Sequence, residues 1–202
     1  MTDSYLTVEN RAETLYKEKG SKFFSFVFPV KDLTEVKSIL DELKKKYYDA
    51  THHCYAYILG FEKETFRMND DGEPSSTAGK PIYGQLQSKN LTNVLLVVVR
   101  YFGGTKLGVS GLIKAYKIAA AECLSAATIV EKKVMLSYKV MFPYEKMNAV
   151  MSLLKEIKAE QTKHIFETEC SMEILVESGK QNKFEDAISK LEKTNFSLLA
   201  RI

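Results

Sequence analysis

Two histidines and a cysteine, His52, His53 and Cys54, are the first residues along this chain that can support chemistry. Their segment has the pattern of a strand, so His52 and Cys54 face one side of a sheet and His53 faces the other. A zinc site needs three or four ligands, and the other cysteines and His164 show no ligand spacing. A Cys54 nucleophile needs a base within hydrogen-bond reach, which a neighbour in the same strand is poorly placed to provide. Packing and hydrogen bonding are the favoured interpretation, with catalysis and metal binding as alternatives.

A carboxylate-rich turn follows at Asp70, Asp71 and Glu73. Three carboxylates can ligate a hard cation, and two can act as a general acid and base. The order of ligands is not that of an EF-hand loop, however, and Asp-Gly and Glu-Pro pairs are typical of solvated turns. A turn is therefore the favoured interpretation. The hydroxyl residues 75–77 can cap a helix that begins near Ala78.

A glycine-rich segment, Arg100-Tyr-Phe-Gly-Gly-Thr-Lys-Leu-Gly-Val-Ser-Gly111, joins a predicted buried strand to a predicted helix. This context is typical of phosphate-binding loops, because glycines let backbone N–H groups approach an anion. Part of the P-loop spacing is present, but Val109 stands where that motif requires lysine. Glycines that permit positive φ and close helix–strand packing are the favoured interpretation. The alternative is a contact of Arg100 or Lys106 with an anion or a backbone phosphate.

Composition narrows the class of protein. The 202 residues include 29 basic and 26 acidic side chains, and a net charge of +3 gives no basis for a protein that coats phosphates over its whole surface. Three separated cysteines imply no disulfide framework. The N-terminal residues lack a signal-peptide pattern, and the longest aliphatic run, 94–99, is too short to span a bilayer. We therefore expect a cytoplasmic protein without a membrane segment.

The elements that must position these residues are of two kinds. The N-terminal part alternates strands and helices, with Asp32 and Glu35 forming a capping-box pattern before the first helix. Its expected elements are a strand over 22–30, a helix over 33–47, strands over 51–59 and 64–68, a polar loop over 69–90, a strand over 93–101 that is buried on both faces, and a deeply buried helix over 110–127.

The C-terminal part has the order β-α-β-β-α-β, which is typical of the ferredoxin-like fold. Its third strand follows the second in one long alternating stretch, 166–176, with an expected turn near Glu167 and Glu169. The fold class is therefore α+β, with a domain over 1–130 and a ferredoxin-like domain over 131–202.

Several motifs in order resemble the IMPACT/YigZ family, in particular its bacterial two-domain members. They are His52-x-Cys54-x-Ala56, Asp70-Asp-Gly-Glu-Pro74, Thr77-Ala-Gly-Lys-Pro-Ile82, Val98-Val-Arg-Tyr-Phe-Gly-Gly104, Leu107-Gly and Gly111-Leu. The resemblance covers roughly residues 15–130. It implies a first domain like the second domain of small-subunit ribosomal protein five and a second domain like the ferredoxin-like domains of elongation factor G. The family usually has glycine where this chain has Ser110.

The same resemblance implies a role in translation. Eukaryotic relatives regulate it by competing for the activator of a starvation-sensing kinase that bacteria lack. We therefore expect a binding protein that contacts RNA, the ribosome or a ribosome-associated protein, without a cofactor, a metal or assigned catalytic residues. One alternative is a small-substrate hydrolase or peptidase-like enzyme that uses segments 52–54, 70–77 and 100–111. Another is a protein–protein adaptor.

The predicted binding residues belong to these three segments. They are His52, Cys54, Asp70, Asp71, Glu73, Thr77, Arg100, Tyr101, Gly103, Gly104, Lys106, Gly108 and Ser110.

Overall fold

The protein is described by a computed structural model that covers residues 2–165 and 169–202. It divides into two compact units, one formed by Tyr5–Lys132 and the other by Met1–Ser4 with Lys133–Ile202. Residues 2–4 were expected in the N-terminal domain, but their contacts group them with the C-terminal unit. The cause is backbone pairing, because Val134 N–H donates to the Asp3 carbonyl oxygen at 2.9 Å.

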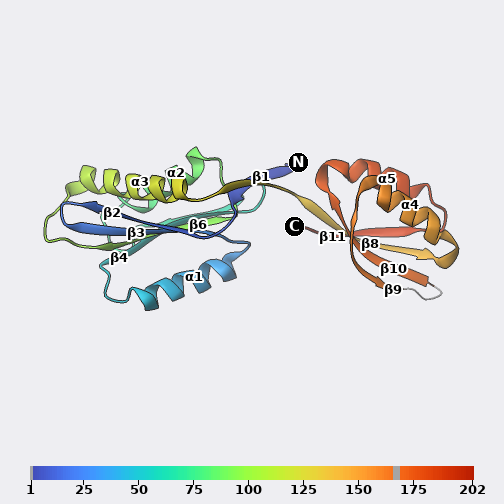
Figure 1. Cartoon of the computed structure of the whole chain (residues 1–202), viewed down its shortest axis with the longest axis horizontal. Coiled ribbons are helices and arrows are strands. Elements are labelled where there is room, and N and C mark those ends of the chain that lie inside the picture. Colours follow the sequence, from blue (N-terminus) through green and yellow to red (C-terminus); the bar gives the residue numbers. More distant parts are fainter. Residues whose placement is uncertain (1, 166–168) are drawn as a thin grey trace. The chain divides into compact units, whose positions relative to one another are not determined.

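The N-terminal unit is a five-stranded antiparallel sheet covered on both faces by helices (Figure 1). The strand order is β2-β3-β6-β4-β5, with α1 on one face and α2 and α3 on the other. The bounds are β2 Ala12–Glu18, β3 Ser21–Pro29, α1 Leu33–Lys46, β4 His52–Leu59, β5 Thr65–Asn69, α2 Gly79–Ser88, β6 Val94–Tyr101 and α3 Gly108–Ala126.

The central strand β6 explains the continuous apolar run of the sequence. Leu95, Val97 and Val99 belong to the core under α1, whereas Leu96 and Val98 belong to the core under α2 and α3. A strand covered on both faces needs apolar residues at every position, not at alternate ones. The expectation that this strand is buried on both faces is confirmed.

The helix α1 begins as its capping pattern predicts. The Asp32 carboxylate accepts from the N–H groups of Thr34 and Glu35 at 2.8 and 2.9 Å. The Glu35 carboxylate reaches back to the N–H of Lys31 at 2.8 Å, one residue before the cap. These bonds satisfy backbone donors that the first helical turn leaves without partners.

Two sequence-based expectations about the other helices are wrong. The stretch over 69–90 is not a loop throughout, because α2 occupies its second half. The helix α3 is not buried on every face outside its polar strip, since Val109 and Ile113 in its first turns are 59% and 39% exposed. The sequence also gave no indication of a two-stranded sheet formed by β1 (Ser4–Val8) and β7 (Ile129–Lys133).

The C-terminal unit has the predicted β-α-β-β-α-β order, and its α+β class is confirmed. Its antiparallel sheet has the order β11-β8-β10-β9, and its core includes side chains of α4 and α5. The stretch 166–176 was expected to hold two strands with a turn near Glu167 and Glu169, but β9 lies before this stretch and Glu169 begins β10. Glu167 lies outside the described residues. The bounds are β8 Met135–Pro143, α4 Met147–Ile157, β9 Glu160–Ile165, β10 Glu169–Glu177, α5 Gln181–Ser189 and β11 Asn195–Arg201, with short 3-10 turns at Tyr144–Lys146 and Ser178–Lys180.

Candidate functional site

A buried charged cluster lies where β3, β6 and β4 run side by side. Arg100 at the end of β6 stands directly opposite His52 of β4 and Phe23 of β3. Residues opposite one another in antiparallel strands share a face of the sheet. Strand pairing thus brings together side chains that are far apart in the sequence.

Glu73 is the centre of this cluster. Its Oε1 accepts from Arg100 Nη1 at 2.6 Å and from the Tyr116 hydroxyl of α3 at 2.7 Å. The side chains of Glu73 and Arg100 are only 3% and 6% exposed. The second carboxylate oxygen of Glu73, Oε2, lies 3.8 Å from His52 Nε2. Buried charges are tolerated when they are paired and hydrogen-bonded. Glu73 Oε1 and both Nη atoms of Arg100 meet this requirement, whereas Arg100 Nε is buried without a hydrogen-bond partner among the described residues.

Cys54 lies beside the same cluster but is poorly suited to act as a nucleophile. Its thiol donates to the Asp70 carbonyl oxygen at 3.0 Å and lies 3.3 Å from the Tyr116 hydroxyl. Burial raises the pKa of the Cys54 thiol far above its ordinary value. His52 Nδ1 is engaged with the Asp71 carbonyl oxygen at 2.7 Å. Since the thiolate is the reactive form of cysteine, this environment keeps Cys54 inert.

The Asp70 carboxylate organises the turn before α2. Its Oδ1 accepts from the N–H groups of Ala78 and Gly79 at 2.9 and 2.8 Å, and its Oδ2 accepts from Ser76 N–H at 2.8 Å. A carboxylate at this position satisfies the free N–H groups of the helix and complements its dipole. Asp70, and not the hydroxyl residues 75–77, therefore caps α2, and the Thr77 hydroxyl donates instead to the Pro74 carbonyl oxygen at 2.6 Å.

Asp71 connects the same turn to β4. Its Oδ2 accepts from His53 N–H at 2.6 Å, and its backbone has a φ of 43°, followed by Gly72 at 86°. Each carboxylate of the segment thus has defined partners within the protein. Among residues 2–165 and 169–202, no three His, Cys, Asp or Glu side chains are grouped as ligands of a metal ion.

The glycine loop comprises residues 102–107 together with the first three residues of α3, 108–110. It is held against the turn between β2 and β3. A Cβ atom on Gly103 would lie 1.9 Å from the carbonyl carbon of Gly20, so only glycine permits this approach. The Ser21 hydroxyl accepts from Gly103 N–H at 3.2 Å and from Arg100 Nη2 at 3.3 Å. Close packing therefore explains Gly103, and a φ of 84° explains glycine at Gly104.

The predicted residues separate into two sets. The first, the buried set, consists of residues that are buried or half-buried and form hydrogen bonds within the protein. They are His52, Cys54, Asp70, Asp71, Glu73, Thr77 and Arg100. A second set lies on the loop or beside it and consists of Tyr101, Gly103, Gly104, Lys106, Gly108 and Ser110, of which all but the half-buried Tyr101 are exposed.

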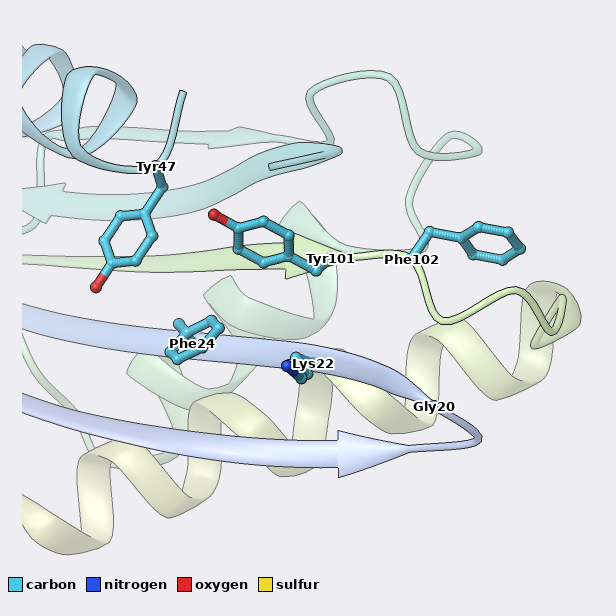
Figure 2. A pocket seen from close by; sticks show the side chains of 6 residues that line it. All are labelled: Gly20, Lys22, Phe24, Tyr47, Tyr101 and Phe102. Atoms are coloured by element: carbon cyan, nitrogen blue, oxygen red, sulfur yellow. The ribbon is translucent and has the colours of Figure 1, made fainter. Parts of the chain in front are cut away.

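The sequence did not predict a pocket that lies next to the glycine loop. Of the residues that line it, only Tyr101 is among the predicted binding residues. This aromatic pocket has a volume of about 450 Å³ and is lined by Gly20, Lys22, Phe24, Tyr47, Tyr101 and Phe102. Figure 2 shows Tyr101 directed toward Tyr47, and Phe102 directed the opposite way. One sequence feature could have indicated the pocket. Three lysines directly precede two tyrosines over 44–48, which places basic and aromatic side chains together.

Comparison with known proteins identifies the family. Residues 19–124 match the family model described as the Impact N-terminal domain. The chain belongs to the IMPACT family. The IMPACT family member YvyE of Bacillus subtilis (strain 168) is 32% identical over 191 residues, which cover 95% of this chain and 88% of that protein. The IMPACT family member YigZ of Escherichia coli (strain K12) is 27% identical over 184 residues, with 90% of each chain covered.

A solved structure extends the likeness to the whole chain. A crystal structure described as that of a hypothetical protein superposes with a TM-score of 0.74 at 25% identity, covering 99% of this chain and 98% of its own. The IMPACT segment 19–124 contains the charged cluster, the glycine loop and the aromatic pocket. Over the described part of the chain, no helix is long and apolar enough to cross a membrane.

The ion pair predicts a large stability effect. Arg100→Met should lower the free energy of unfolding by about 3–5 kcal/mol, because Glu73 is left buried without its cation. Adding Glu73→Gln to Arg100→Met should restore part of this loss, since the remaining group is neutral. Urea denaturation measures both. As a control, Lys183→Met removes an exposed ion pair with Glu156 and should cost less than about 1 kcal/mol. Equal small losses for Arg100→Met and Lys183→Met would contradict the role given to the buried pair.

The Cys54 environment predicts an unreactive thiol. In a variant with Cys123→Ser and Cys170→Ser, Cys54 is the remaining thiol. Its labelling by a disulfide reagent at pH 8 should be at least about a hundredfold slower in the native protein than in urea, because burial disfavours the thiolate. Native labelling at the rate of the unfolded chain would reveal an accessible thiolate and would revive the nucleophile hypothesis.

Proposed function

We propose that this IMPACT family protein is a non-catalytic binding protein of the translation system. It contacts RNA, the ribosome or a ribosome-associated protein in the cytoplasm. The contact surface is the glycine loop, where Phe102, Lys106 and Ser110 are exposed. The observation that carries the proposal is the division between this exposed loop and the cluster beneath it. The titratable groups of that cluster already have partners within the protein.

The family resemblance supports the link to translation. Its eukaryotic members regulate translation, and both of its domain types resemble domains of translation proteins. A function must be argued from a site and not from fold likeness alone. The resemblance therefore supports a role in translation, and the exposed glycine loop supports the choice of contact surface. In this proposal the IMPACT-like domain, residues 1–130 in the sequence-based division, makes the contact. The ferredoxin-like domain, residues 131–202, offers a separate surface.

The two sets of predicted residues receive different roles. The buried set, centred on Glu73 and Arg100, positions the loop through the Ser21 hydroxyl and the approach of Gly103 to Gly20. The exposed set binds the partner. Lysine side chains contact phosphates, and backbone N–H groups of a glycine-rich loop can add hydrogen bonds to the same oxygens.

The alternative of a hydrolase or peptidase-like enzyme has less support. Catalysis by acyl transfer needs a nucleophile, a base within hydrogen-bond reach and a group that orients the base. The Cys54 thiol contacts Asp70 and Tyr116 and not a histidine, and the Asp70 carboxylate is bonded to backbone N–H groups. The arrangement is that of a structural support.

Co-sedimentation with bacterial ribosomes tests the proposal. The wild-type protein should pellet with ribosomes at low salt and be released at moderate salt, because phosphate contacts weaken as counterions compete. Lys106→Glu should weaken binding and lower the slope of log affinity against log salt by about one. The matched control is Lys37→Glu, the same charge change on an exposed lysine of α1.

Two results would count against this function. Wild-type protein that neither pellets with ribosomes nor is retained on filters with RNA would remove the proposed partner class. Equal losses for Lys106→Glu and Lys37→Glu would show that overall charge, and not the glycine loop, governs binding.

A further inference from the structure

We propose that the aromatic pocket holds an unpaired base of single-stranded RNA while the lysines around it contact the adjoining phosphates. This inference rests on the proposed function and names the ligand class of that surface. The pocket lies directly beside the glycine loop, because Tyr101 ends β6 and Phe102 begins the loop (Figure 2).

The walls of the pocket are aromatic and ordered. The rings of Phe24 and Tyr47 are stacked with centroids 5.7 Å apart, and Tyr101 meets Phe24 edge-on at 5.9 Å. The Tyr101 hydroxyl donates to Asp49 Oδ1 at 2.6 Å, which fixes the orientation of its ring. Because the side chains of the pocket are already ordered, a base can bind without ordering them first. Such preorganisation lowers the entropic cost of binding.

One lining ring, Phe102, is itself exposed, and a second exposed ring, Tyr48, follows the pocket residue Tyr47 in the sequence. Phe102 is 48% exposed, and the guanidinium carbon of Arg100 lies 5.7 Å from its ring centroid. Tyr48, next to the pocket residue Tyr47, is 83% exposed. Exposed aromatic rings are unfavourable in water and are the surfaces on which single-stranded bases stack. Phe102 therefore offers a stacking surface for a base that flanks the bound one.

The charges around the pocket complement a polyanion. Lys17 of β2 stands directly opposite the pocket residue Lys22 of β3, on the same face of the sheet. Like charges at such positions destabilise a sheet, and neither lysine forms an ion pair within the described residues. The last turn of α1 adds Lys44–Lys46, and Lys46 Nζ lies 5.2 Å from the Tyr47 ring centroid. Binding of a phosphate backbone would relieve this repulsion.

The combination favours RNA over a peptide. Aromatic-lined grooves also bind proline-rich peptides, which need no cationic rim. Sequence-tolerant binding of single strands combines a positive groove with aromatic stacking, and this pocket has both. Its volume of about 450 Å³ is within the range of small-molecule sites. Bases within a duplex are stacked on one another and are not available to such a pocket.

Fluorescence anisotropy with labelled ten-nucleotide RNAs tests the pocket. The full-length protein should bind single-stranded adenine and uracil decamers more tightly than a ten-base-pair RNA duplex. Phe102→Ala should weaken single-strand binding about 5- to 150-fold, the effect of losing one base–aromatic stack. Lys22→Glu should weaken it as well and reduce its salt dependence. Because both side chains are exposed, circular dichroism should show that the variants remain folded.

Matched controls use the same changes away from the pocket. Phe66→Ala removes a ring that is 51% exposed on the edge strand β5, and Lys37→Glu reverses an exposed charge on α1. Both variants should bind the single strands within about twofold of wild type, since neither residue lines the pocket.

The outcomes separate this inference from the proposed function. Unchanged affinity in Phe102→Ala and Lys22→Glu, equal affinity for duplex and single strand, or binding of a labelled decaproline in place of RNA would each overturn the pocket assignment. Ribosome co-sedimentation without decamer binding would also overturn it while leaving the proposed function intact. Loss of both kinds of binding would remove the proposed function and the pocket together.

Discussion

The buried ion pair between Arg100 and Glu73 is the constraint on which the N-terminal unit depends. Two charges removed from water are stable only if each finds a partner in good geometry. That requirement draws the Tyr116 hydroxyl of α3 and the Ser21 hydroxyl of β3 to the same point. The turn before α2, the long helix, the central strand and the start of the glycine loop are therefore joined at one place in the sheet.

The residues whose types suggest chemistry are engaged in contacts that support the turn and the loop. The groups near Glu73 are occupied in holding the turn and the loop, and burial raises the pKa values of Cys54 and Tyr116. The groups left exposed are lysines, aromatic rings and loop backbone, which are suited to charge, stacking and hydrogen-bond contacts with a ligand. The consequence is a rigid surface with two neighbouring parts, the glycine loop and the aromatic pocket, both within the segment that defines the IMPACT family.

Local patterns predicted the parts of this structure that depend on near neighbours. Asp32 caps α1 through N–H groups that lie two and three residues away. The apolar run 94–99 predicts a strand that is covered on both faces. The capping role of Asp70 could not be predicted from a local pattern. Its N–H partners lie six to nine residues ahead in the sequence, across a turn. The contact of Gly103 with the turn between β2 and β3 depends on strand pairing across more than eighty residues. The aromatic pocket is formed by three separate segments, 20–24, 47 and 101–102, so no periodicity within one segment can indicate it.

Hydrogen–deuterium exchange in the wild type and in Glu73→Gln tests most directly whether the ion pair positions the binding surface. The account predicts faster exchange in two segments, 19–24 and 100–108, which the Ser21 hydroxyl links to Arg100. Exchange in the C-terminal unit should stay unchanged, because its core is separate. Faster exchange confined to 70–80, with the glycine loop as protected as in the wild type, would contradict the claim that the buried charges hold the loop in place.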